Sequence, residues 1–80
     1  MYHYVYILQS KRNPDKYYTG YTTDLKKRLK KHNEGGCEHT SNYKPWEIKT
    51  AIAFREKEKA LKFEKYLKSH SGRAFAVKHF

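Results

Sequence analysis

The chain is poor in cysteine and in long apolar stretches, and each shortage excludes a class of protein. A single cysteine, Cys37, excludes an intramolecular disulfide and suits a reducing compartment. The neighbouring Glu38 and His39 raise the question of zinc, but a tetrahedral site needs a second ligand pair at defined spacing, and the sequence has none. No stretch approaches the roughly 18 consecutive apolar residues of a membrane span, and the first residues lack the pattern of a secretory signal. We therefore expect a cytoplasmic protein that does not associate with membranes.

Acidic residues are also scarce, because 8 Asp and Glu stand against 18 Lys and Arg, which gives a formal net charge of +10. This balance attracts polyanions, and nucleic acid is the first partner to expect. The aromatic content of 16% is too high for a disordered basic tail. A chain of 80 residues is the size of one small domain, so residues 1–80 are expected to fold as one unit. The sequence gives no indication of an oligomeric state.

Hydrophobic periodicity divides the chain into six short elements. Residues 2–9 are strand formers with apolar side chains on both faces. Turn residues at 13–15 lead into a second strand over 17–22, which completes an antiparallel hairpin. A helix over 24–33, an irregular loop over 35–45, a strand over about 47–55, a helix over about 56–69 and a short terminal helix follow. The order β-β-α-β-α-α predicts an α+β fold within the broad α/β class, a three-stranded, mainly antiparallel sheet flanked by helices.

The helix predicted over residues 24–33 carries a basic surface and two polar residues beside its apolar stripe. Thr23 is the predicted N-cap, and Gly35 is expected to help end the helix. Arg28 and His32 are four residues apart, so we expect both to be half-buried next to the sheet. The residues alone leave open whether they are boundary side chains or functional groups. The other basic side chains form a solvated face that is the candidate contact with nucleic acid: Lys26, Lys27, Lys30 and Lys31.

Glu64 occupies a position where the helical pattern requires an apolar residue. Ala60, Phe63 and Leu67 share its predicted buried face. A buried ionised carboxylate is costly unless it is paired, hydrogen-bonded or bound to a metal. Two explanations therefore stay open: an ion pair with Arg28 or a nearby lysine, or a hard metal such as Mg²⁺ held by few carboxylates plus water and substrate phosphates.

Two tyrosines of the predicted hairpin form a third unusual feature. Tyr6 lies in the middle of the first strand and Tyr18 in the second, and the hairpin connection brings them near each other. Gly20 lies on the same strand face as Tyr18, and we expect it to leave space where a ligand or phosphate approaches the backbone. Tyrosines in a sheet are usually packing residues with a hydrogen-bonded hydroxyl, so the residues alone leave a functional role open.

The order of these motifs along the chain resembles the GIY-YIG nuclease family. The matching features are Tyr4-Val5-Tyr6, Tyr18-Thr19-Gly20, the helical Arg28 and His32, and the later helical Glu64. In the first motif Tyr and Val replace Gly and Ile, and in the second Thr replaces Ile. The resemblance covers nearly the whole chain and is greatest to small, stand-alone bacterial members.

This resemblance implies hydrolysis of phosphodiester bonds in DNA with Mg²⁺ or Mn²⁺ as the cofactor. It implies that Tyr6 acts as general base or activates the water, and that Tyr18 helps to hold the water and a phosphate oxygen. Arg28 would stabilise charge on the phosphate, His32 would support proton transfer, and Glu64 would be the single protein ligand of the metal. A phenol has an unperturbed pKa near ~10, whereas imidazole titrates close to neutral pH. The choice of base between Tyr6 and His32 therefore stays open.

Two departures from the family pattern are the reason to consider other functions. Tyr21 stands where many members have a lysine after the second motif, and no asparagine follows Asn42, although Ser69 or Ser71 is a possible substitute for the late active-site asparagine. The first hypothesis is an endonuclease acting on branched or otherwise structured DNA in repair or recombination. The second is a nucleic-acid-binding module of the same fold that does not cleave, and the third is an adaptor that binds RNA or acidic partners.

Overall fold

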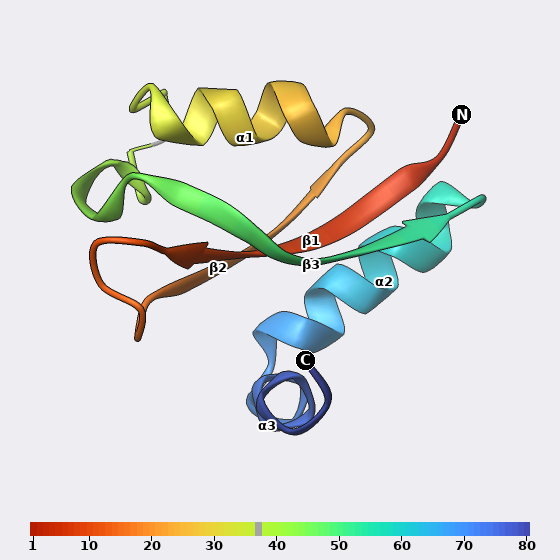
Figure 1. The fold of residues 1–80 in the computed structure, drawn as a ribbon. Helices are drawn as coiled ribbons and strands as arrows, with labels where there is room; N and C mark the ends of the chain where they lie inside the picture. Colours follow the sequence, from red (N-terminus) through yellow and green to blue (C-terminus); the bar gives the residue numbers. More distant parts are fainter. Residues whose placement is uncertain (37) are drawn as a thin grey trace.

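The computed structural model describes residues 1–36 and 38–80, which form a three-stranded sheet with helices on both faces (Figure 1). The expectation about zinc near Cys37 concerns a residue that lies outside this description. The observed order confirms the predicted β-β-α-β-α-α arrangement. Its elements are β1 (His3–Ser10), β2 (Tyr17–Thr22), α1 (Leu25–Asn33), a 3₁₀ turn (Ser41–Tyr43), β3 (Trp46–Phe54), α2 (Lys57–Lys68) and α3 (His70–His79).

The sheet has the strand order β2-β1-β3, and both pairings are antiparallel. The central strand β1 is buried on both faces, as the strand pattern predicted. Tyr6 and Leu8 pack with Trp46 in the cluster that adjoins α1, whereas Val5 and Ile7 pack with residues of α2 and α3. In Figure 1, α1 covers one face of the sheet, and α2 and α3 lie against the other. The edge strand β2 therefore runs between two helical layers.

The start of α1 differs from its prediction by one residue. The expected N-cap, Thr23, is wrong, because Asp24 has the extended backbone of a cap and its carboxylate accepts a hydrogen bond from the backbone N–H of Lys27 at 3.0 Å. The side-chain hydroxyl of Thr22, the last residue of β2, accepts a hydrogen bond from the backbone N–H of Asp24 at 3.1 Å. The end of α1 follows the prediction, because Gly35 takes a left-handed backbone with φ of 79°.

A one-residue break separates α2 from α3. Ser69 accepts a hydrogen bond from the backbone N–H of Gly72 at 3.1 Å, and this caps α3. Gly72 packs so closely on the carbonyl of Tyr66 that a Cβ there would overlap it. The chain therefore turns sharply after Lys68, which places α3 beside the end of α2. Among the described residues, no helix has the length and apolarity to cross a membrane.

Candidate active site

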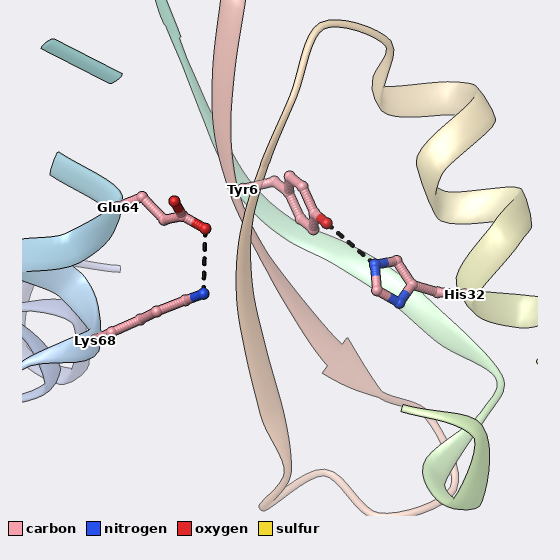
Figure 2. A network of polar contacts seen from close by, with 4 residues as sticks. All are labelled: Tyr6, His32, Glu64 and Lys68. Carbon is pink, nitrogen blue, oxygen red and sulfur yellow. Dashed lines mark hydrogen bonds and ion pairs between the residues drawn. The ribbon is translucent and has the colours of Figure 1, made fainter. Parts of the chain in front are cut away.

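A buried hydrogen bond between Tyr6 and His32 is the centre of the site. Tyr6 projects from β1 toward α1 with 2% of its surface exposed, and His32 projects from the last turn of α1 with 0% exposed. The Tyr6 hydroxyl lies 3.0 Å from His32 Nε2 (Figure 2). The alternating pattern of β1 directs Tyr6 to this face, and the helical pattern directs His32 to the sheet. Two motifs that are 26 residues apart in the sequence therefore meet inside the protein.

Gly20 makes room for the Tyr6 side chain. The two residues are paired across β1 and β2. A Cβ built on Gly20 would overlap the hydroxyl and Cζ of Tyr6. The prediction that Gly20 leaves open space for a phosphate is therefore wrong, because the Tyr6 ring fills that space. A glycine is needed here so that the phenol can lie across the outer strand.

Tyr18 completes an aromatic cluster with the central pair. Its ring centroid is 6.4 Å from that of Tyr6 and 5.0 Å from that of His32. This confirms the prediction that the hairpin brings Tyr6 and Tyr18 together. Tyr18 is half-buried, so it is the member of the cluster that faces solvent most.

The second ring nitrogen of His32 is held by Thr40, a residue that the sequence patterns did not indicate. His32 Nδ1 lies 2.8 Å from the buried Thr40 hydroxyl. The indole N–H of Trp46 donates to the Thr40 carbonyl at 2.8 Å, and Asn33 Nδ2 donates to the Trp46 carbonyl at 3.1 Å. Both ring nitrogens of His32 are therefore engaged, which fixes the orientation of the imidazole. No periodic signal reveals Thr40, because it lies in the irregular segment between α1 and β3.

Burial lowers the pKa of His32 below its ordinary value of 6.5, and the nearby charges of Arg28 and Lys31 lower it further. The imidazole is therefore neutral at pH 7 and carries one ring proton. Arg28 is half-buried one helical turn before His32, as predicted, whereas His32 is fully buried rather than half-buried. A neutral imidazole beside a phenol has a free nitrogen lone pair and can accept a proton from it.

We expect the free energy of unfolding to fall as the pH decreases below 6.5. The unfolded chain binds a proton at His32 with the ordinary pKa, whereas folded His32 resists protonation, so acid favours the unfolded state. One such group contributes at most about 1.4 kcal/mol per pH unit. Denaturant titrations between pH 5 and 7, with pH values chosen around the ordinary pKa, should show a shallower dependence in His32→Gln. The exposed His39→Gln variant is the control, and an identical slope in His32→Gln and the wild type would contradict the assignment.

Glu64 and Lys68 lie on the other side of β2 from the Tyr6–His32 pair (Figure 2). The Glu64 side chain is 20% exposed, and its Oε2 lies 3.1 Å from Lys68 Nζ. Of the two ion-pair partners that the sequence allowed, the structure places a nearby lysine there and not Arg28. Lys68 Nζ also lies 5.7 Å from the ring centroid of Tyr18. Lys68 therefore connects Glu64 to the aromatic cluster, and its i, i+4 spacing from Glu64 was the available sequence signal.

Comparison with known proteins identifies the family. The model of the GIY-YIG catalytic domain matches residues 2–77. The chain belongs to the GIY-YIG family. It is 43% identical over 74 residues to UPF0213 protein BH0048 of Halalkalibacterium halodurans, covering 91% of this chain and 77% of that protein. It is 40% identical over 67 residues to UPF0213 protein YazA of Bacillus subtilis, covering 82% of this chain and 66% of YazA.

A solved structure supports the same assignment. The solution NMR structure of UPF0213 protein BH0048 matches with a TM-score of 0.58 at 40% identity, and the match covers 98% of this chain and 84% of that chain. The resemblance inferred from the motifs is thus confirmed. The GIY-YIG assignment places the chain in a family of nucleases and makes DNA the substrate class that the family suggests.

The two motifs that give the GIY-YIG family its name are neighbours in the sheet. Tyr6 of the first motif is paired with Gly20 of the second, and Leu8 is paired with Tyr18. The substitutions at Tyr4, Val5 and Thr19 leave this register intact. The geometry therefore depends on the two tyrosines and the glycine, which are the motif residues that this chain keeps.

The chemistry of the single Glu64 carboxylate suits a hard divalent cation. No group of three or more His, Cys, Asp or Glu side chains is gathered anywhere in residues 1–36 and 38–80. Mg²⁺ needs no such cage, because it binds one or two carboxylates and takes water and phosphate oxygens as its other ligands. The partly exposed Glu64 carboxylate has oxygen donors of this kind. Because Lys68 pairs with this carboxylate, a cation bound to Glu64 would have to share the carboxylate with Lys68 or displace it.

The four lysines predicted to contact nucleic acid are exposed on α1. No acidic residue lies in the first turn of this helix, and its last turn carries Lys30, Lys31 and His32. Their charges create a positive potential on the face of the GIY-YIG domain that carries α1. Lys31 also contributes to the lowered pKa of His32, so this basic surface adjoins the buried pair.

Proposed function

We propose that this GIY-YIG domain is a divalent-metal-dependent endonuclease that hydrolyses phosphodiester bonds in branched or otherwise structured DNA. The observation that carries the proposal is the buried hydrogen bond between Tyr6 and a neutral His32, with Tyr18 beside them. A purely structural core gains little from a buried polar pair of this kind, because apolar side chains of similar volume would pack there without needing hydrogen-bond partners. The pair instead gives the site a route for a proton.

In this proposal Tyr6 and His32 act together as the base. The His32 tautomer with its proton on Nδ1 donates to the Thr40 hydroxyl, which leaves Nε2 free to accept the Tyr6 proton. As water attacks phosphorus, its proton passes to the Tyr6 oxygen and the phenolic proton passes to His32. The new P–O bond forms while the bond to the leaving oxygen breaks, and that oxygen takes a proton from solvent. The lowered pKa of His32 keeps it ready to accept the proton at neutral pH.

The other site residues balance charge on the phosphate. Arg28 supplies a fixed positive charge near His32, and Tyr18 offers a hydroxyl to the water or a phosphate oxygen. Glu64 would hold Mg²⁺ or Mn²⁺, which when bound neutralises charge that develops on the phosphate and leaving oxygens. These roles correspond to the family positions that the motifs matched. They require the substrate phosphate to lie at the outer edge of β2, where both sides of the site meet.

The proposal is tested by cleavage of linear, flapped and four-way DNA with Mg²⁺ or Mn²⁺. We expect cleavage by the wild type and a loss of about 10²-fold or more in Tyr6→Phe, because the phenolic proton relay is removed. His39→Gln, which changes an exposed histidine outside the site, is the matched control. Binding of all three substrates without any metal-dependent cleavage would overturn the proposal and favour the non-cleaving module.

Binding to DNA is expected to depend on salt through the lysines of α1. If about three to five phosphates are neutralised, the logarithm of the binding constant should fall with the logarithm of salt concentration with a slope of roughly −3 to −5. Replacing Lys26 and Lys30 together by glutamine should reduce the magnitude of this slope by up to about 2. Fluorescence anisotropy in EDTA measures binding without cleavage. A slope near zero for the wild type would contradict a phosphate-binding surface.

A further inference from the structure

A groove on the α2 and α3 side of β2 has a lining that, apart from Tyr18 and Lys68, lies outside the proposed chemistry. It is a cavity of about 820 Å³ between the first half of β2, the end of α2 and α3. Its lining combines four cations with a single carboxylate. The cations are those of Lys16, Lys49, Lys68 and Arg73, and the carboxylate is that of Asp15.

The groove also has an apolar floor and an exposed aromatic wall. Ile7, Leu67 and Phe80 contribute apolar surface to the lining. Tyr17, at the start of β2, is 49% exposed. Lys49 Nζ lies 4.8 Å from the centroid of its ring, and this contact orients the ring at the rim. The groove therefore offers flat apolar surface and positive charge in one place.

The groove is continuous with the candidate active site. Tyr18 and Lys68 line the groove, and both belong to the contacts that join Glu64 to the aromatic cluster. An extended ligand that leaves the site along β2 would meet Tyr17 next and then the cationic side chains of the groove. The ligand that extends from a phosphodiester at the site is the next nucleotide of the same strand.

We propose that this groove binds an unpaired DNA strand next to the scissile phosphate, an inference that rests on the proposed function and specifies its substrate. Unpaired bases expose their faces to aromatic and apolar side chains, while cations bind the backbone. In a duplex the bases are stacked on each other and cannot reach an apolar floor. The basic surface of α1 suits duplex phosphates, whereas the groove suits a strand that has left the duplex.

The test compares binding of a short fluorescent oligothymidylate with binding of a blunt duplex, measured by anisotropy in EDTA so that no cleavage occurs. Tyr17→Ala should weaken binding of the single strand about 5- to 150-fold, the effect of one stacked base. Arg73→Gln should weaken it as well, and both variants should leave duplex binding unchanged. Lys30→Gln on α1 is the matched charge control and should weaken duplex binding instead.

The outcomes separate this proposal from the proposed activity. If Tyr17→Ala and Arg73→Gln reduce both affinities equally, or reduce neither, the groove does not bind an unpaired strand. Circular dichroism spectra and melting curves like those of the wild type establish that the exposed substitutions leave the fold intact. Selective loss of single-strand binding in a protein that never cleaves would keep the groove assignment and refute only the nuclease activity.

Discussion

The substitution Glu64→Gln is expected to abolish metal-dependent DNA cleavage while leaving the stability of the protein nearly unchanged. The carboxylate is the group at the site suited to a hard divalent cation, and an amide of the same size binds such a cation poorly. Loss of transition-state charge stabilisation of this kind typically costs about 10²- to 10³-fold in rate. Cleavage rates measured across a range of Mg²⁺ and Mn²⁺ concentrations provide the test.

Stability distinguishes a metal ligand from a structural ion pair at this position. The Glu64–Lys68 contact is an i, i+4 pair with the lysine side chain 49% exposed, and pairs of this type contribute about 0.3–0.5 kcal/mol. We therefore expect only a small change in the melting temperature of Glu64→Gln. Glu58→Gln, at an exposed position in the first turn of the same helix, should leave cleavage unchanged and lower the melting temperature only slightly, because it removes a negative charge from the helix N-terminus. A large melting decrease in Glu64→Gln alone would contradict the metal-ligand role.

The substitution Gly20→Ala is expected to disrupt both the fold and the site, although it adds one methyl group. The new Cβ overlaps the end of the buried Tyr6 ring, so the ring or β2 has to move. Overpacking of this kind costs typically about 1–3 kcal/mol. The displaced Tyr6 hydroxyl would also lose its contact with His32, so cleavage should fall as far as it does in Tyr6→Phe. Chemical denaturation and the cleavage assay measure the two effects separately.

A double-mutant cycle shows whether Tyr6 is the cause of this effect. In a Tyr6→Ala background the ring is absent, and Gly20→Ala should then cost much less stability than it does in the wild type. The difference is the coupling energy between the two positions, which for residues in contact is commonly about 0.5–3 kcal/mol. Equal costs in the two backgrounds would show that Gly20 is required for its backbone and not for the space that it leaves.

The local features of the fold could be predicted from the sequence because they depend on short-range periodicity. The two apolar faces of β1, the hairpin and the end of α1 at Gly35 all follow from side chains within a few residues of each other. The cap of α1 was misplaced by one residue because Thr23 and Asp24 are both good caps, and the backbone after β2 decides which of them is used. The motif residues Tyr6, Tyr18 and Gly20 were identified from their order along the chain.

The contacts between elements were harder to predict from the sequence than the elements themselves. Periodicity placed Glu64 on a largely buried face but left its partner open, and only the structure shows that Lys68 is that partner. Thr40 and Trp46 have no periodic signal: Thr40 holds His32 from a loop, and Trp46 at the start of β3 donates to the Thr40 carbonyl. The sequence predicts that Gly20 leaves space for a ligand, whereas in the structure the Tyr6 side chain of the neighbouring strand occupies that space.

The family and the order of the elements could be inferred from the sequence alone, and the sequence also supplied the site residues that the proposal uses. These inferences depend on residue types and spacings, which the amino-acid sequence gives directly. Only the tertiary structure shows that Tyr6 and His32 share a hydrogen bond and that burial lowers the pKa of His32. The reason is physical: a helical or strand period fixes which face a side chain occupies, whereas the pKa and the partner of that side chain depend on what another element places against that face.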